Sequence, residues 1–417
     1  MTGDPPVRIE TCIPERREPG LTLFNIRPGS VAGREAPGGW VIGLDQAGEF
    51  EFCRAYTFGP QDTTALPNGN FLSSRSATDL ITEMTLSGDI VRQWYAAGKW
   101  EDKEPPEGAI RIDLPLFHHR VNILANGNLL LLSMEIRRIE NWPASDSDPD
   151  AGTETASVVG DVIAEVAPDG TIMNTWRMLD MLDPYRLCYG SRAAYWVRQG
   201  FPDTQDWCHA NAVSHDARDD SILVSLRTQD CIVKFSRQTG ELVWILGDPG
   251  NWKAPWSGKL LTPVGDLDWQ YHQHDGTVTP SGTVLCFDNG NYRALPFVDK
   301  LPPEDNHSRV VEFEVDDAAM TVRQVWFWDG AQSAPGPVYA CYQGGATRLP
   351  KTGNTLMTYG GIVTRDGAPI DIAEGGFCRA RIVEIAPDGD IVLDLWVDGS
   401  ADDMPLSVFR AEHYPKS

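Results

Sequence analysis

Two short motifs alternate along the chain and constrain its fold more than any other feature. The first is an apolar stretch, a tight turn with Gly or Asn, and a second apolar stretch, as in "ALPNGNFL" (65–72), "ILANGNLLLL" (123–132) and "RLPKTGNTLM" (348–357). Weaker copies are "VTPSGTVLCF" (278–287) and "VSHDARDDSILVS" (213–225). Gly and Asn supply the positive φ angles that such turns require. Each copy therefore predicts a pair of strands joined by a tight turn.

The second motif follows each copy and consists of two alternating strands around a polar turn. It ends in a tryptophan, at Trp94, Trp176, Trp244, Trp326 and Trp396. The segment "WVIGLDQAGEFEFCRAY" (40–56) is a sixth copy, whose other half we expect to come from elsewhere in the chain. Six units of four strands predict an all-β fold, a six-bladed β-propeller. We expect the five tryptophans in equivalent positions, packed between neighbouring blades.

We expect residues 1–417 to form one propeller domain, because closed β architectures often use a long chain as one unit. The expected blades span about 20–56, 60–94, 118–176, 208–244, 273–326 and 343–396. Long aromatic connections between them, and an acidic insertion at 138–160, predict loops around the mouth of a binding site.

The charge balance limits the partners of the chain. The net charge of −24 disfavours nucleic acid and anionic membranes, so an anionic substrate would need a locally basic pocket. No apolar run reaches the length of a membrane span, and no basic and apolar leader precedes the repeats. The eight cysteines form no CxxC pair, which predicts reduced thiols, with Cys208 beside His209 of most interest. We expect a cytoplasmic protein with a small-molecule substrate.

The first motif also aligns the histidines. Five residues before the start of the turn, the copies carry Gln61, His119, His209, His274 and Gly344. In a propeller this position starts the innermost strand, so three blades would aim imidazoles at one axis. Such convergence is typical of catalytic or metal sites. The alternative is a structural hydrogen-bond network within each blade.

Further polar residues complete the predicted site. Arg293 follows "FDNGN" in the same blade as His274, and is either an anion clamp or one half of a surface salt bridge. The aromatic loop at 185–207 suggests a wall on which a substrate ring stacks. The residues that we expect to bind substrate are His118, Gln61, Asn211, His272, Gln343 and Tyr195.

Several stretches resemble the bacterial arylsulfotransferase family, among them "DWCHANAV" (206–213), "WILGDP" (244–249), "HHRVNILANGNLLLL" (118–132) and "VFRAEH" (408–413). The resemblance covers most of the chain from about Gly59 onward. It implies a six-bladed propeller in which a channel histidine attacks the sulfur of an aryl sulfate. The resulting sulfohistidine then passes the sulfuryl group to a phenol. His209, His274 and Arg293 match the family's H-x-N histidine, Q-H histidine and "FDNG…R" arginine.

The chain departs from this pattern in its last blade. The attacking histidine that the resemblance implies would fall near 339–350, where the sequence has Tyr342, Gln343 and Gly344. His119 or His209 would then have to act as the nucleophile. Two alternatives remain open. One is a lyase or hydrolase in which His119, His209 and His274 bind one divalent metal ion or act as acid and base, and the other is a non-catalytic ligand-binding propeller. The sulfuryl-transfer reading needs no cofactor.

Overall fold

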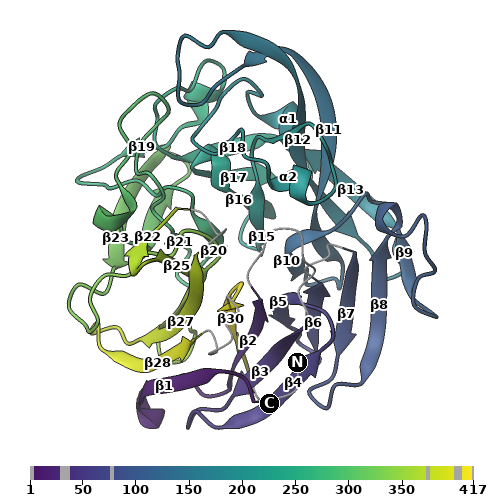
Figure 1. Cartoon of the computed structure of the whole chain (residues 1–417), viewed down its shortest axis with the longest axis vertical. Coiled ribbons are helices and arrows are strands. Elements are labelled where there is room, and N and C mark those ends of the chain that lie inside the picture. The colour runs from purple at the N-terminus through teal and green to yellow at the C-terminus, as the bar shows by residue number, and fades with distance from the viewer. Residues whose placement is uncertain (1–3, 29–37, 76–78, 372–375, 399–405, 416–417) are drawn as a thin grey trace.

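The computed structural model describes residues 4–28, 38–75, 79–371, 376–398 and 406–415. The strands in these ranges form six sheets, which surround a common centre (Figure 1). The predicted all-β fold, a six-bladed propeller, is therefore confirmed. We number the blades in chain order, each from its innermost strand outward.

Blades 1 to 3 occupy the first half of the chain. Blade 1 contains β30 (Ala411–Tyr414), β2 (Leu21–Pro28), β3 (Gly39–Leu44) and β4 (Phe50–Tyr56), with β29 (Leu406–Ser407) also on β2. Blade 2 contains β5 (Pro60–Ala65), β6 (Phe71–Arg75), β7 (Leu80–Met84), β8 (Ile90–Ala96) and β9 (Ile110–Ile112). Blade 3 contains β10 (His118–Ile123), β11 (Leu129–Pro143), β12 (Thr153–Val166) and β13 (Ile172–Arg177), with β14 (Thr204–Asp206) on β12.

Blades 4 to 6 repeat the arrangement. Blade 4 contains β15 (Ala210–Asp216), β16 (Ser221–Leu226), β17 (Cys231–Ser236) and β18 (Leu242–Gly247). Blade 5 contains β20 (His274–Val278), β21 (Val284–Asp288), β22 (Arg309–Asp316), β23 (Thr321–Trp328) and β19 (Thr262–Pro263). Blade 6 contains β24 (Gly345–Arg348), β25 (Thr355–Arg365), β27 (Phe377–Ile385), β28 (Ile391–Val397) and β1 (Val7–Cys12), with β26 (Ala368–Pro369) on β25.

The helical segments of the described chain are short and lie mostly in the connections. Two are α-helical turns, α1 (Met178–Met181) and α2 (Tyr195–Arg198). Five are 3₁₀ turns, at Pro14–Arg16, Ala97–Lys99, Arg227–Gln229, Trp256–Lys259 and Pro303–Asp305. The acidic insertion at 138–160 is not a free loop. Its two sides extend β11 and β12, which pair from Leu129↔Val166 to Pro143↔Thr153.

The two ends of the chain close the ring. The innermost strand of blade 1 is the C-terminal β30, which pairs antiparallel with β2 from Leu21↔Tyr414 to Phe24↔Ala411. The N-terminal β1 instead joins the outer edge of blade 6 by pairing with β28. The innermost strands contact one another in the cyclic order β5, β10, β15, β20, β24, β30 and back to β5. The missing half of the sixth repeat is thus supplied by the C-terminus.

Each pair of neighbouring blades buries an apolar layer. In β11, Leu129 and Leu131 pack toward blade 2, whereas Leu130 and Leu132 pack toward blade 4. This alternation follows from the two-residue period of a strand, which buries both faces of a central blade. Each fully buried leucine contributes roughly 1.5–3 kcal/mol relative to an exposed one. The blades therefore stabilise one another and could not stand alone.

The closing tryptophans follow the prediction in four blades but not in the sixth. Trp94, Trp176 and Trp244 pack in the layer shared with the next blade, and Trp326 packs there half-buried. Trp396 instead faces blade 5, while Leu395 takes the position toward blade 1.

The turn of blade 6 explains this difference. Trp94 and Trp176 stand an even number of residues after the turn glycines Gly88 and Gly170, whereas Trp396 stands an odd number after Gly389. One extra residue in a strand moves its side chains to the opposite face. The predicted equivalence of Trp396 is therefore wrong.

A recurring hydrogen bond links the inner strands and fixes their true register. Thr64 donates to Val121 O at 2.9 Å, Asn122 to Val213 O at 3.2 Å, Ser214 to Gly276 O at 2.9 Å, and Thr277 to Ala346 O at 3.4 Å. Counted from these donors, Asn211 is equivalent to His119 and His274, and His209 lies two residues earlier. The sequence alignment of His209 was therefore wrong by two residues, because the hairpin of blade 4 is longer.

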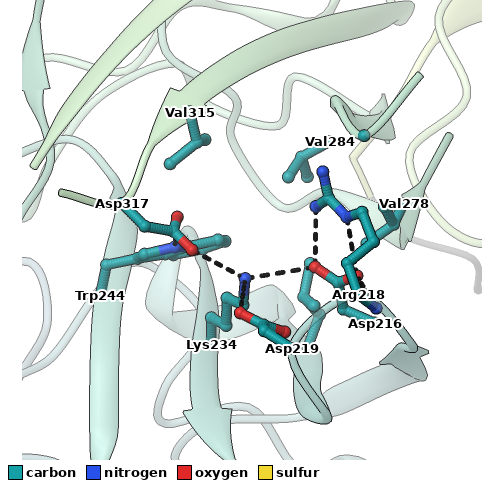
Figure 2. Close-up of a pocket in the computed structure, with 11 residues that line it drawn as sticks. Asp216, Arg218, Asp219, Lys234, Trp244, Val278, Val284, Val315 and Asp317 are labelled. Carbon is teal, nitrogen blue, oxygen red and sulfur yellow. Dashed lines mark hydrogen bonds and ion pairs between the residues drawn. The ribbon is translucent and has the colours of Figure 1, made fainter.

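A polar cluster connects blades 4 and 5 near their outer side. Lys234 lies in a pocket of about 230 Å³ and contacts Asp216 at 3.2 Å, Asp219 at 2.7 Å and Asp317 at 2.9 Å (Figure 2). The indole of Trp244 donates to Asp317 at 2.8 Å. A buried ammonium group requires such partners. The cluster is thus a structural link between the blades.

The structure agrees with the expectation of reduced thiols and of no apolar run long enough to span a membrane. All eight cysteines are free, and six of them are buried. The thiol of Cys208 donates to the Asp161 carboxylate at 2.7 Å, and burial raises its pKa well above the usual range. Cys208 is therefore a protonated structural group. Within the described residues, no helix is long and apolar enough to cross a membrane.

Buried ion pairs join the inner strands at the centre of the ring. Arg410, just before β30, contacts Asp62 of β5 at 2.9 Å and Glu412 at 2.9 Å. Arg120 of β10 pairs with Asp275 of β20, whose other oxygen accepts from Ala346 N at 3.1 Å. These contacts tie together the inner strands of five blades.

Replacing Arg410 by methionine should therefore destabilise the ring, because it leaves the buried Asp62 carboxylate without its cation. We expect Arg410→Met to lower the free energy of unfolding by about 3–5 kcal/mol. The exposed Arg323–Glu314 pair offers the matched control, and Arg323→Met should cost about 1 kcal/mol or less. Denaturant titration measures both. Equal losses in the two variants would contradict the structural role of Arg410.

Candidate active site

The candidate site begins with His119, at the start of the innermost strand of blade 3. Its backbone is in the left-handed region, with φ 54°, and His209 of blade 4 has φ 44°. For residues with a side chain this conformation costs about 1–3 kcal/mol and persists only where the surroundings impose it. The strain turns both imidazoles toward each other, with ring centroids 4.9 Å apart.

Hydrogen bonds determine which nitrogen of His119 is free. His118 Nε2 lies 3.0 Å from Ser133 O, which can only accept, so this nitrogen carries the proton. With the His118 proton on Nε2, its Nδ1 can accept a hydrogen bond from His119 Nδ1, which lies 2.9 Å away. His119 Nδ1 must therefore donate. The result is a lone pair on His119 Nε2.

His209 is held by a carboxylate. Its Nδ1 lies 2.6 Å from Asp206 Oδ2, three residues earlier in the chain. A carboxylate in this position orients the ring and stabilises the imidazolium that forms when Nε2 takes a proton. The ring of Tyr195, from α2, lies 4.5 Å from that of His209 and 6.1 Å from that of His119. An aromatic side chain thus borders both histidines.

His274 has the same free nitrogen as His119. Its Nδ1 lies 2.7 Å from Asn289 Oδ1. The amide nitrogen of Asn289 already donates to Ala340 O at 2.8 Å and to Gln343 O at 2.9 Å, so Asn289 Oδ1 must accept. His274 therefore carries its proton on Nδ1.

Burial and neighbouring charge keep two of the imidazoles neutral. Burial lowers the pKa of His119 well below its usual range, and the positive charge of Arg27 lowers it further. Burial also lowers the pKa of His274, with Arg227 as the next contributor. A neutral imidazole with a free Nε2 can act as a nucleophile or a base. The convergence of His119 and His209 is confirmed by their contact, and His274 lies within electrostatic reach of both.

Two arginines stand near these histidines. Burial lowers the pKa of Arg27, at the end of β2, and its charge acts on His119, Tyr195 and Tyr342. The backbone N–H of Arg227 donates to His209 O at 3.1 Å. Neither guanidinium forms an ion pair with a carboxylate in the described part of the chain. The cluster therefore contains two guanidinium groups without a carboxylate partner among the described residues.

Arg293 is not available as the predicted anion clamp. Its Nη1 contacts Asp288 at 3.1 Å, its Nε donates to Asn306 at 3.2 Å, and its Nη2 donates to His307 O at 2.9 Å. Asp288 also pairs with Arg309 at 2.8 Å. All three nitrogens of Arg293 thus have internal partners. Arg293 therefore forms the salt bridge expected as the alternative, but this salt bridge is largely buried instead of lying on the surface.

The structure places some of the residues expected to bind substrate beside the histidine cluster and others in structural contacts. Tyr195 borders the histidines, and the backbone carbonyl of Gln343 accepts from Asn289 beside His274. His118 is buried against Asp161 and supports His119 from behind. Asn211 donates to Gln273 O at 2.7 Å and joins blades 4 and 5.

The last two expected substrate ligands are also buried. His272 contacts Asp230 at 2.9 Å and packs on the ring of Tyr292. Gln61 is buried beside Asp62 and makes no side-chain hydrogen bond to a described residue. Of the six residues expected to bind substrate, His118 and Tyr195 thus contact the clustered histidines directly.

Sequence reasoning missed three members of the cluster. Asp206 stands three residues before His209 in "DWCH", and this spacing could have identified it. Arg27 lies in blade 1, which carries no histidine motif, and Arg227 follows the second strand of blade 4, outside the aligned motif. No sequence signal therefore marked either arginine. For the metal alternative, no group of three His, Cys, Asp or Glu side chains among the described residues is arranged to hold a metal ion.

The fold and the cluster together define a class of protein, a β-propeller with histidines clustered at the start of its innermost strands. The chain matches the arylsulfotransferase (ASST) family over residues 40–404, and it belongs to that family.

Two relatives share part of this sequence. The arylsulfate sulfotransferase AssT of Escherichia coli O6:H1 is 31% identical over 211 residues, covering 41% of this chain and 35% of that protein. The protein of the same name from Lelliottia amnigena is 29% identical over 209 residues, covering 40% of this chain and 34% of that protein. The matched part thus spans about a third of the length of these relatives.

Solved structures resemble the chain only distantly. A Bacteroides caccae protein of unknown function has a TM-score of 0.46 at 11% identity, covering 93% of this chain and 98% of that one. The periplasmic gluconolactonase PpgL of Pseudomonas aeruginosa has a TM-score of 0.39 at 13% identity, covering 94% of this chain and 100% of that one. These identities do not transfer an activity.

The neutral state of His119 and His274 makes stability depend on pH. The unfolded chain takes up protons on these imidazoles near pH 6.5, whereas the folded protein does so only at lower pH. The free energy of unfolding should therefore fall as the pH drops below about 6.5, by about 1.4 kcal/mol per pH unit for each histidine. Denaturant titrations between pH 7.5 and about 5 measure this slope. The double variant His119→Asn, His274→Asn should show a clearly shallower slope, and unchanged slopes would refute the neutral assignment.

Proposed function

We propose that this chain transfers a sulfuryl group from an aryl sulfate ester to a phenol, with His119 as the nucleophile. The observation that supports this most is the free Nε2 of His119, whose ring centroid lies 4.9 Å from that of an imidazole held by a carboxylate. Membership of the arylsulfotransferase family supports the reaction class. This assignment also accounts for the absence of histidine at Tyr342, Gln343 and Gly344.

The two histidines would divide the chemistry because their environments differ. His119 is kept neutral by burial and neighbouring charge, which favours attack through its lone pair. His209 has the Asp206 carboxylate on Nδ1, which favours carrying a proton on Nε2. A nucleophile beside an oriented acid–base group is the usual arrangement for covalent catalysis.

In the first step, the Nε2 lone pair of His119 attacks sulfur and forms an N–S bond. The S–O bond to the aryl group breaks, and the leaving phenolate oxygen takes the Nε2 proton of His209. In the second step, a phenol returns its proton to His209 and its oxygen attacks sulfur. The N–S bond then breaks, and its electron pair returns to His119. Each step leaves atoms and charge balanced, and the enzyme ends in its starting state.

The aromatic ring of the substrate would lie against Tyr195. This side chain borders both reacting imidazoles, and aromatic pairs at such distances gain about 0.5–1.5 kcal/mol beyond burial. Burial raises the pKa of Tyr195 above its usual range, so it remains a neutral phenol. It can therefore stack without repelling an anionic substrate.

The first test is turnover of p-nitrophenyl sulfate with phenol as acceptor. The protein should release nitrophenol faster when the acceptor is present, because the second step needs it. His119→Ala should lower kcat/KM by at least about 10³-fold, as expected when a covalent nucleophile is removed. His215→Ala, a half-buried histidine in the blade 4 hairpin, is the matched control and should stay active.

Turnover that survives His119→Ala would contradict the assignment of the nucleophile. Activity that is lost to a chelator, in a protein with one bound metal ion per chain, would instead favour the metal-dependent lyase or hydrolase.

The second test separates the acid from the nucleophile by the leaving group. His209→Ala should slow phenyl sulfate by about 10²–10⁴-fold, because phenolate is a poor leaving group that needs the proton. The same variant should slow p-nitrophenyl sulfate much less, since nitrophenolate leaves without protonation. Asp206→Asn should lower the turnover of the two substrates in the same pattern as His209→Ala, with the larger loss on phenyl sulfate. An equal loss on both substrates would argue against His209 as the general acid.

A further inference from the structure

Buried guanidinium groups in this chain usually meet a carboxylate. Arg17 pairs with Glu384 at 3.1 Å, Arg381 with Asp394 at 2.8 Å, and Arg410 with Asp62 at 2.9 Å. Arg27 and Arg227 differ, since both are only partly buried and neither forms an ion pair within the described residues. A partly buried cation without a described counter-charge is a common property of binding sites.

Arg27 reaches the cluster from blade 1. It lies opposite Ser407 in the pairing of β2 with β29. With the Gln343 amide in its favourable orientation, the guanidinium donates to the amide oxygen of Gln343. The amide nitrogen of Gln343 then donates to Val408 O at 3.3 Å and to Ser407 Oγ at 3.2 Å. Neutral partners thus hold Arg27 in place, and no carboxylate among the described residues pairs with it.

Arg227 reaches the cluster from blade 4. Its backbone bond to His209 O places it directly after β16, next to the proposed acid. Its Nη2 donates to Cys341 O at 3.3 Å, and its buried Nε has no hydrogen-bond partner among the described residues. Its charge also lowers the pKa of His274. The guanidinium therefore has hydrogen-bond donors, among them Nε, that no described residue uses.

We propose that Arg27 and Arg227 form the anion-binding site of this propeller and hold the oxygens of a tetrahedral sulfuryl or sulfate group between them. Guanidinium groups bind such anions through paired, charge-assisted hydrogen bonds. The inference rests on the proposed function for the identity of the anion. It assigns to these two residues the role that the family resemblance gives to Arg293, whose three nitrogens are engaged inside blade 5.

The pair would act most strongly as the reaction proceeds. Negative charge on the non-bridging sulfuryl oxygens must be stabilised while the S–O bond breaks and the N–S bond forms. Positive groups fixed in a largely water-free site stabilise such charge without reorganisation. The chain has a net charge of −24, so an anion would be repelled over most of its surface. These two cations therefore also determine where an anion can bind.

Calorimetric titration of the whole protein with inorganic sulfate tests the site without any turnover. We expect one saturable site, and Arg27→Met and Arg227→Met should each weaken it about 10-fold or more. Arg323→Met, which removes an exposed ion-paired arginine, should leave binding unchanged. Arg293→Met should also leave sulfate affinity unchanged if the protein folds. Loss of binding in Arg293→Met with normal binding in the other two variants would overturn the proposal.

Thermal stability gives a second readout that a structural arginine would move in the other direction. Without sulfate, Arg27→Met and Arg227→Met should unfold at the same temperature as the parent protein or higher, because each removes a partly buried charge that has no ion-pair partner among the described residues. Arg381→Met, which breaks a buried ion pair, should unfold at a lower temperature. If the Arg27 and Arg227 variants lose as much stability as Arg381→Met, the two arginines are structural and the proposal fails.

The outcomes separate this inference from the proposed reaction. Sulfate binding that depends on Arg27 and Arg227, in a protein without sulfuryl transfer, would keep the anion site and reject the reaction. Transfer that is insensitive to both arginines would keep the reaction and reject the site. The absence of saturable sulfate binding also rejects the site.

Discussion

The pairing of β30 with β2 is the interaction on which the rest of the molecule depends. It supplies the innermost strand of blade 1 from the far end of the sequence and so completes the ring (Figure 1). The same segment brings Phe409 within 5.8 Å of the His119 ring and Arg410 into contact with Asp62. The C-terminal segment that completes the ring therefore also packs against His119 and supplies an ion pair at the centre of the propeller.

The centre of the ring divides its charges into two groups. The ion pairs of Arg410 with Asp62 and of Arg120 with Asp275 are internally balanced and join the inner strands. Beside them, Arg27 and Arg227 form no ion pair within the described residues. The neutral state of His119 follows from the same arrangement, because burial and neighbouring positive charge both oppose its protonation. The same arrangement would therefore favour both the proposed anion site and the proposed nucleophile.

The sequence predicted the propeller because its repeats carry both strand periods and turn residues, and the strands follow that pattern. The prediction failed where a single residue changes a register. The odd spacing after Gly389 reversed Trp396, and the longer hairpin of blade 4 displaced the alignment of His209. His119, His209, His274 and Tyr195 were found from their residue types and positions. Arg27 and Arg227 could not be found, because they depend on contacts between blades distant in sequence. The inward pairing of Arg293 could not be found because it depends on how the connection between β21 and β22 folds back on Asp288.

The most direct measurement is to locate the sulfuryl group on the protein. The chain is incubated with p-nitrophenyl sulfate without an acceptor, digested at neutral to alkaline pH to preserve an N–S bond, and analysed by tandem mass spectrometry. The account predicts a modification on His119 that disappears when phenol is added. A modification on His209, His274 or Tyr342, or transfer without any modified residue, would contradict the central role of His119.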